Sequence, residues 1–261
     1  MTNGHKTADH GRSLLRLLLV WAIVSVALLQ WLQVPHGHGA NILQLELARD
    51  ATAFEHALAG WREDRELVCG MGAQPAATGG GFGTLRCQLF FDSIGLVPAY
   101  VGLLLFFSLA LGRAAGMHGT VLRHGLCAPA VAAGLFDIAE NGMTGRALED
   151  FLLVVLADAT VRDVMTASLG KWALLALAFA LLAALALAAA RRGRTSPGGR
   201  PGWLVAAAAL GGVAALLLAL GTWRAEAALL GWGMRAAVLA LALLSAWRWR
   251  HGPIEPSGRR R

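Results

Sequence analysis

The sequence predicts an all-α, polytopic transmembrane helix bundle with six spanning helices and one amphipathic helix in the first outer loop. The first observation behind this prediction is composition: 56% of the 261 residues are hydrophobic and 15% are charged. Soluble domains carry about 25% charged residues, and the mean hydropathy here is +0.56. The second observation is a set of six apolar runs near the length of about 20 residues that a spanning helix needs. The runs are 14–34, 93–111, 126–144, 167–190, 203–221 and 227–247.

Basic residues are distributed unevenly among the segments that join these runs. With the N-terminus in the cytoplasm, 14 of the 23 Lys and Arg residues fall in cytoplasmic segments and seven in outer segments, while Lys171 and Arg235 lie within spans. A basic excess on the cytoplasmic side is the usual orientation signal. We therefore predict a multi-pass protein of the bacterial cytoplasmic (inner) membrane with both termini in the cytoplasm. The net charge of +7 then reflects topology and contact with anionic membrane lipids, and we expect no nucleic-acid partner.

The first apolar run has two possible roles. The polar segment 1–13 contains Lys6 and Arg12 and precedes the run, as the basic region of a signal peptide would. The run continues to Val34, whereas the apolar core of a signal peptide has about 7–15 residues. This length favours a retained spanning helix after a cytoplasmic tail, and a cleaved signal peptide is the alternative.

The longest loop, 35–92, is predicted to lie on the outer side. Its first part, 41–61, has apolar residues at helical spacing and charged residues between them, which predicts an amphipathic helix on the membrane or on the bundle. Further along the loop are Cys69 and Cys87. An oxidising compartment favours a disulfide between them, and two free thiols are the alternative.

The six runs group into a core and a hairpin. The division is a four-helix membrane core at 14–190, a cytoplasmic linker at 191–202, a C-terminal transmembrane hairpin at 203–250 and a basic cytoplasmic tail at 251–261. In the hairpin, small residues at 206–209 and 211–212 predict close helix packing. Between the third and fourth runs, the apolar stretch 151–157 is too short to cross a bilayer, so we predict an interfacial or re-entrant segment there.

Three strongly polar side chains interrupt the third apolar run. Asp137, Glu140 and Asn141 stand at i, i+3 and i+4 and therefore share one helix face. A carboxylate at membrane depth costs at least ~2.5 kcal/mol on insertion scales, and two on one face also repel. Because Lys171 and Arg235 are the basic residues within the spans, we predict that one of them pairs with these carboxylates. A buried functional site is one interpretation of the cluster, and a clamp between helices is the other.

Other polar residues are expected at the same depth of the membrane. With a rise of about 1.5 Å per residue, Asp92 at the outer edge of the second run and Tyr100 within it belong to this layer. Tyr100, Asn141 and Ser168 of the fourth run would complete the hydrogen bonds of this candidate pocket. An oxygen-only ligand set would also suit Mg²⁺ or Ca²⁺, and no other cofactor is evident. Its members would be Asp92, Asp137, Glu140 and Asn141.

Short motifs in a fixed order add a resemblance. They are Glu46-Leu47-Ala48, Trp61, Asp92 with Tyr100, Asp137-x-x-Glu140-Asn141 and Ala167-Ser168-x-x-Lys171-Trp172. Over residues 41–190 this pattern resembles a group of small bacterial polytopic membrane proteins of unknown activity. The resemblance implies the membrane architecture and adds Glu46 to the candidate site residues, but it implies no reaction.

The sequence favours a membrane protein with a charged pocket in the outer half of the bilayer that binds or processes a small amphiphile or a lipid headgroup. One alternative is a structural or assembly protein whose polar cluster only locks the bundle. Another is a proton- or cation-coupled transporter, although no inverted repeat supports it. No recognised nucleophile motif or His/Cys ligand cluster is present, so no catalytic residue is predicted.

Overall fold

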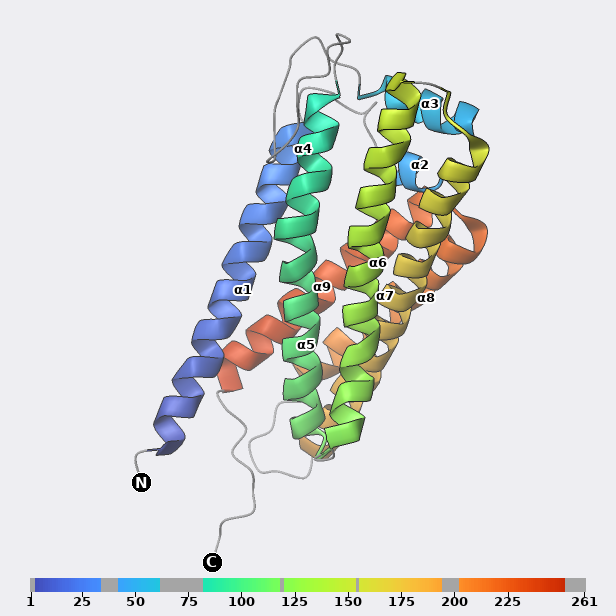
Figure 1. Ribbon diagram of the computed structural model, residues 1–261. Coiled ribbons are helices and arrows are strands. Elements are labelled where there is room, and N and C mark those ends of the chain that lie inside the picture. The colour runs from blue at the N-terminus through green and yellow to red at the C-terminus, as the bar shows by residue number, and fades with distance from the viewer. Residues whose placement is uncertain are drawn as a thin grey trace, which may run out of the picture.

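Helices account for every regular element in the part of the chain that the structure describes (Figure 1). In this computed structural model, the described residues are 3–33, 42–61, 82–117, 120–153, 155–193 and 202–251. The elements are α1 (Asn3–Gln33), α2 (Ile42–Glu46), α3 (Ala51–Ala59), α4 (Gly83–Phe91), the π-helical turn η2 (Asp92–Leu96), α5 (Val97–Ala114), α6 (Thr120–Leu153), α7 (Asp158–Gly193), α8 (Gly202–Arg224) and α9 (Ala227–His251). The all-α prediction is therefore confirmed for the described residues.

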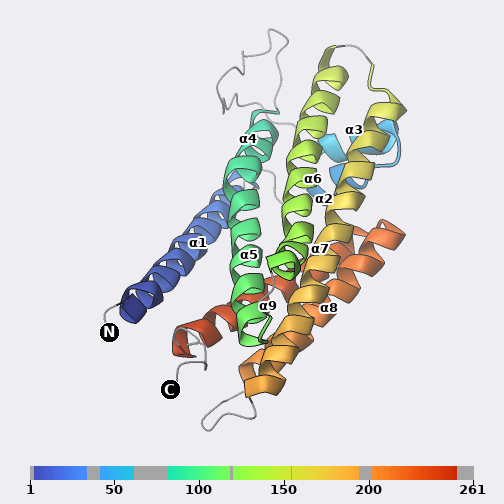
Figure 2. The same ribbon diagram turned by 60° about the horizontal axis from the view of Figure 1, so that its bottom comes forward.

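The long helices form an elongated bundle in which α4, η2 and α5 make one continuous rod beside α6 and α7 (Figures 1 and 2). Helix α1 flanks this rod, and α8 and α9 form a hairpin along α7. Helix α9 runs obliquely to the start of α1, where the Arg16 guanidinium lies 4.7 Å from the ring centre of Trp249. We call this end of the bundle the terminal end. The opposite end carries α2 and α3, and we call it the α3 end (Figure 1).

Five described helical segments are long and apolar enough to cross a membrane. They are Gly11–Leu32, Gly83–Ala114, Asp158–Gly193, Gly202–Arg224 and Ala227–Arg250. An integral membrane protein is therefore supported. The third predicted span falls in α6 (Thr120–Leu153), which is not among the five. Helix α6 nevertheless runs along the whole length of α5 and α7, from the terminal end to the α3 end (Figures 1 and 2).

The second predicted span begins earlier than expected. The sequence predicts its start at residue 93, but α4 begins at Gly83, so Asp92 lies inside the rod rather than at its edge. The rod widens into a π turn at this point, where the Val97 N–H donates to the Asp92 carbonyl. Pro98 follows directly, and a proline has no N–H for the helical ladder. The missing donor therefore coincides with the place where the hydrogen-bond register changes.

The predicted amphipathic helix at 41–61 is instead two short helices, α2 and α3. Asp50 breaks it, because this residue is extended (φ −150°, ψ 170°) and its carboxylate accepts from the Ala53 N–H at 2.8 Å as the N-cap of α3. The apolar face lies on the bundle: Phe54 and Trp61 are fully buried and pack with α6 and α7. The amphipathic pattern thus covers the α3 end of the bundle.

The stretch 151–157, predicted as an interfacial or re-entrant segment, contains no separate helix among its described residues. Helix α6 continues to Leu153, and α7 begins at Asp158, so the two helices form a hairpin with a short connection. The helix continues because its apolar residues keep helical spacing. Leu148 is buried, and Phe151 packs edge-on against Phe82 with 6.1 Å between ring centres.

Of the small residues that predict close packing, Gly211 lies close to α7 and Gly212 has no neighbour within 4 Å of its Cβ position, while the close α8–α9 contacts lie further along α8. A Cβ on Gly211 would lie 3.3 Å from the Cβ of Ala183 in α7, and one on Gly221 would lie 2.8 Å from Leu230 in α9. The two helices are joined by a tight turn in which Ala225 takes a positive φ of 50°. The α8–α9 pair is therefore held by close approach of helix surfaces.

One sequence prediction involves a residue outside the described part. Cys87 is buried in α4, but Cys69 lies outside the described residues. The Cys69–Cys87 disulfide therefore stays a prediction.

Candidate functional site

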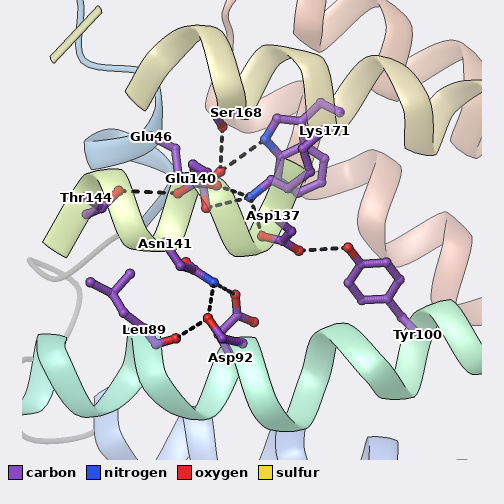
Figure 3. A network of polar contacts seen from close by, with 12 residues as sticks. Glu46, Leu89, Asp92, Tyr100, Asp137, Glu140, Asn141, Thr144, Ser168 and Lys171 are labelled. Atoms are coloured by element: carbon purple, nitrogen blue, oxygen red, sulfur yellow. Dashed lines mark hydrogen bonds and ion pairs between the residues drawn. The ribbon is translucent and has the colours of Figure 1, made fainter. Parts of the chain in front are cut away.

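A single buried lysine lies at the centre of a charged cluster (Figure 3). The Lys171 Nζ atom of α7 lies 3.1 Å from Asp137 Oδ1 of α6 and 3.1 Å from Glu46 Oε1 of α2. A third ion pair joins Lys171 to Glu140 of α6. Lys171 is 4% exposed and Glu140 is 0% exposed, so these charges are removed from solvent. The predicted pairing of Lys171 with the carboxylates of the third span is present.

Glu46 attaches the short helix α2 to α7. Its Oε2 atom accepts hydrogen bonds from Ser168 Oγ at 3.0 Å and from Trp172 Nε1 at 3.1 Å, while its Oε1 atom faces Lys171. Ser168, Lys171 and Trp172 lie within about one turn of α7, which brings three donors to one carboxylate. The loop segment is therefore held to the bundle by both oxygens of one side chain.

The cluster extends to α5 and η2 through three further hydrogen bonds. Tyr100 of α5 donates to Asp137 Oδ2 at 2.8 Å, so each Asp137 oxygen has a partner. Asn141 of α6 donates from Nδ2 to Asp92 Oδ2 at 2.8 Å and to Ser93 Oγ at 3.1 Å. Polar contacts thus connect the rod, α6, α7 and α2 at one level of the bundle (Figure 3).

Carboxyl groups outnumber the lysine in this cluster. Glu46, Asp137 and Glu140 surround Lys171, and Asp92 follows through Asn141. Four ionised carboxylates against one ammonium would leave a strong excess of negative charge in a medium that solvates charge poorly. The cluster as a whole must therefore hold protons or bind additional cations.

The structure brings together all but one of the candidate residues that the sequence suggests. The network contains Glu46, Asp92, Tyr100, Asp137, Glu140, Asn141, Ser168 and Lys171. Arg235 is apart from it: this residue is exposed on α9, and its guanidinium lies 4.5 Å from the ring centre of Trp232. The pairing of Arg235 with the cluster is therefore wrong, because its helix turns that face away from α6.

Ser93 and Gln88 belong to this region but were not predicted. Ser93 is bonded to Asn141, and Gln88 is buried one turn before Asp92 in α4. The signal that would have found Gln88 is its spacing, since residues at i and i+4 share a helix face. From the sequence, Gln88 falls in the predicted loop 35–92, so its helical spacing from Asp92 is not apparent.

Among the described residues, no group of three or more His, Cys, Asp and Glu side chains is arranged to hold a metal ion. The Lys171 ammonium lies between Glu46, Asp137 and Glu140, where a cation bound by these carboxylates would lie. Binding of Mg²⁺ or Ca²⁺ therefore stays a prediction without a ligand set in this part of the chain.

A separate cleft of about 760 Å³ lies at the α3 end, between α2–α3 and the α8–α9 turn. Its lining residues are Leu43, Gln44, Leu47, Ala48, Arg49, Asp50, Thr52, Ala53, His56, Ala57, Ala225 and Ala227. Helix α2 forms one wall, since Leu43 and Leu47 line the cleft while Glu46 contacts Lys171. Helix α2 and the residue that follows it thus contribute both to the cleft and to the charged cluster.

Comparisons of this chain with models of known protein families, with characterised proteins and with solved structures found no match. The resemblance to a group of small bacterial membrane proteins therefore stays a prediction. The function is argued below from the cleft, the cluster and the topology.

Proposed function

We propose that this chain is a six-span membrane protein that binds the headgroup of a small amphiphile in the outer half of the bilayer. The observation that carries the proposal is the cleft at the α3 end, whose lining combines apolar residues with Arg49, Asp50 and His56. Its volume of about 760 Å³ lies within the range of about 300–1,000 Å³ that is usual for ligand pockets.

The arrangement of the helices supports six crossings. Helix α5 ends at the terminal end, and α7 begins at the α3 end, so α6 has to pass between the two (Figure 1). Together with the five segments that are apolar enough to span, α6 brings the proposed number of membrane crossings to six, which is even. An even number returns the chain to its starting side, in agreement with the start of α1 and the end of α9 lying together. The basic excess then makes the terminal end cytoplasmic.

The chemistry of the cleft suits an anionic headgroup with a short apolar tail. Leu43, Leu47 and the surrounding alanines offer apolar surface, and Arg49 and His56 also line the cleft. Arg49 is exposed and forms no ion pair with any other described residue, whereas Asp50 is used as the cap of α3. A free guanidinium is well suited to bind a phosphate or a carboxylate.

The charged cluster has a positioning role in this proposal. Helix α2 is only five residues long, and a helix of that length is not stable by itself. The contacts of Glu46 with Lys171, Ser168 and Trp172 hold α2 in place, and α2 is a wall of the cleft. The cluster would therefore fix the shape of the cleft without touching the ligand.

Binding of dihexanoyl phosphatidylglycerol to the full chain in detergent tests the proposal. Arg49→Gln should weaken binding about tenfold, since a charge-assisted hydrogen bond contributes about 1.5–3 kcal/mol. Ala53→Trp should block the cleft without changing charge. Arg162→Gln is the matched control, because Arg162 is exposed on α7 and does not line the cleft. Equal affinities for Arg49→Gln and Arg162→Gln would refute the proposal.

A structural or assembly role is the second candidate. It is favoured by the ion pairs of Lys171, which leave its ammonium group surrounded by carboxylates. Three carboxylates from two elements hold one ammonium, as a lock between helices would. On this alternative, Glu140→Gln would lower the yield of folded protein and Arg49→Gln would change neither the yield nor any binding. If the cleft instead binds a ligand, Arg49→Gln should leave the yield of folded protein unchanged and weaken ligand binding.

A further inference from the structure

Asp92 is a carboxylate inside a membrane-spanning segment with no basic partner among the described residues. Its Oδ2 atom accepts from the Asn141 amide at 2.8 Å, while Lys171 is already paired with three other carboxylates. An amide donor compensates only part of the cost of burying a charge in hydrocarbon. Asp92 therefore needs a proton or another cation as its counter-charge.

A buried oxygen without a donor lies one turn away. Gln88 is 5% exposed, and its Oε1 atom has no hydrogen-bond partner. Gln88 stands four residues before Asp92 on the same helix face, and helical side chains lean towards the N-terminus of their helix. The side chains of Gln88 and Asp92 therefore leave the helix on the same face. A cation is one partner that would satisfy a buried acceptor without a donor.

The π turn supplies a third oxygen. The Val97 N–H donates to the Asp92 carbonyl, and the next residue, Pro98, has no N–H. The Ser93 carbonyl is therefore left without a donor from the next turn of its own helix. Irregular helical turns in membrane proteins recur at functional sites, and their freed carbonyls coordinate Na⁺ or accompany proton binding.

The neighbouring elements add acceptors and negative charge. Both amide hydrogens of Asn141 are used, towards Asp92 and Ser93, so its carbonyl oxygen is left as an acceptor. The charged and titratable groups that surround Asp92 are Asp137 and Glu140 of α6, Lys171 of α7, Glu46 of α2 and Tyr100 of α5. Helix α1 packs on the same turn with Ser25 against Gly95 and has no charged residue between Leu17 and Leu32.

From these four observations we propose that Gln88, Asp92, Ser93 and Asn141 form a binding site for one monovalent cation, either a proton or a small hard ion such as Na⁺. The site is distinct from the Lys171 ion pairs and from the cleft. It does not depend on the amphiphile proposal, so either can fail without the other. Its ligands would be the carboxylate, two side-chain amide oxygens and the backbone carbonyl of the π turn.

Carbodiimide labelling of the full chain in liposomes tests the site. Dicyclohexylcarbodiimide reacts with a protonated carboxyl group in apolar surroundings, and mass spectrometry of the peptides identifies the labelled residue. We expect an adduct on Asp92 in acidic buffer without Na⁺, and less adduct as the pH rises. Protection by NaCl but not by choline chloride would identify Na⁺ as the cation, and protection by high pH alone would identify a proton. An adduct that responds to neither, or no adduct in acidic buffer, would overturn the proposal.

A matched pair of variants separates the site from general stability. Gln88→Leu removes one ligand and should shift the protecting Na⁺ or proton concentration about tenfold. Gln30→Leu, an exposed glutamine of α1, should leave it unchanged. If Gln88→Leu fails to fold, thermal unfolding of Asp92→Asn in NaCl and in choline chloride replaces it, because ligand binding stabilises only the native state. Salt-specific or pH-specific stabilisation that survives Asp92→Asn would refute the site.

Discussion

The α6–α7 pair and the α8–α9 pair hold two long helices together in different ways. Between α6 and α7, Lys171 pairs with Asp137 and Glu140, and the same lysine holds α2 through Glu46. Between α8 and α9, Gly221 lies close to Leu230, and Gly233 lies close to Leu218. Both pairs lie in segments that we assign to the membrane, where lipid tails give helices little hydrophobic reason to associate.

The two kinds of contact make the two interfaces sensitive to different substitutions. A buried ion pair concentrates the interaction on a few atoms, so removal of one partner leaves an uncompensated charge. Glycine contacts spread the interaction over a surface, where added volume matters more than charge. The first interface should therefore respond to changes of charge and the second to changes of size.

Loss of the central lysine should have the largest effect. Lys171→Met is expected to lower the free energy of unfolding by about 3–5 kcal/mol, because three carboxylates lose their common partner. Thermal unfolding in detergent, or the yield of folded protein, measures this change. Glu140→Gln combined with Lys171→Met should recover part of the loss. An unchanged melting temperature for Lys171→Met would contradict the polar lock.

Removal of a single hydrogen bond at the edge of the cluster should cost less. Tyr100→Phe deletes the donor to Asp137 Oδ2, and a hydrogen bond to a charged group contributes about 1.5–3 kcal/mol. Chemical denaturation of the detergent-solubilised protein gives the value. In an Asp137→Asn background the same change should cost much less, and an equal cost in both backgrounds would mean that the contact does not couple the two helices.

The glycine interface should respond to one added methyl group. In Gly221→Ala the new Cβ would meet Leu230 side-chain atoms at 2.8 Å and its backbone nitrogen at 2.9 Å, so we expect a loss of about 1–3 kcal/mol from overpacking. Gly212→Ala is the control on the same helix, because nothing lies within 4 Å of its Cβ position. Unfolding curves of the two variants should differ, and similar curves would argue against close packing as the basis of the hairpin.

Removal of the second basic residue within the spans should have the smallest effect. Arg235 contacts the Trp232 ring on an exposed face of α9, and an exposed cation–π contact contributes about 0.5–1 kcal/mol. Arg235→Met therefore serves as the charge-matched control for Lys171→Met. If the two variants lose equal stability, then the number of charges rather than the contacts of Lys171 determines the effect.

The sequence carried enough information to find the centre of the cluster. Asp137 and Glu140 share a face by spacing alone, and the cost of burying two carboxylates requires a cation from another span, which Lys171 provides. Local reasoning could not exclude Arg235, because the direction in which a helix face turns depends on the packing of the whole bundle. Charge and depth limited the choice to two residues, and tertiary structure decided between them.

The irregular segments were the least predictable. The π turn at Asp92 depends on Pro98 six residues later and on the extension of the rod back to Gly83. The split of 41–61 depends on Asp50 as a cap that competes with helix continuation. At the α6–α7 hairpin, Leu148 and Phe151 pack in one apolar cluster with residues of α3 and α4, and Phe151 also contacts Phe82. In each case the deciding contact comes from a distant part of the chain.

The long separation between Glu46 and its partners in α7 sets the order of events during synthesis. Glu46 and Trp172 are 126 positions apart, and a chain is made and inserted from its N-terminus. The carboxylates of α2 and α6 therefore enter the membrane region before Lys171 leaves the ribosome. Until α7 inserts, the nascent protein carries acidic groups without their ammonium. The cluster can therefore form only after α7 has been made, and a chain that stops before α7 lacks the lysine that pairs with these carboxylates.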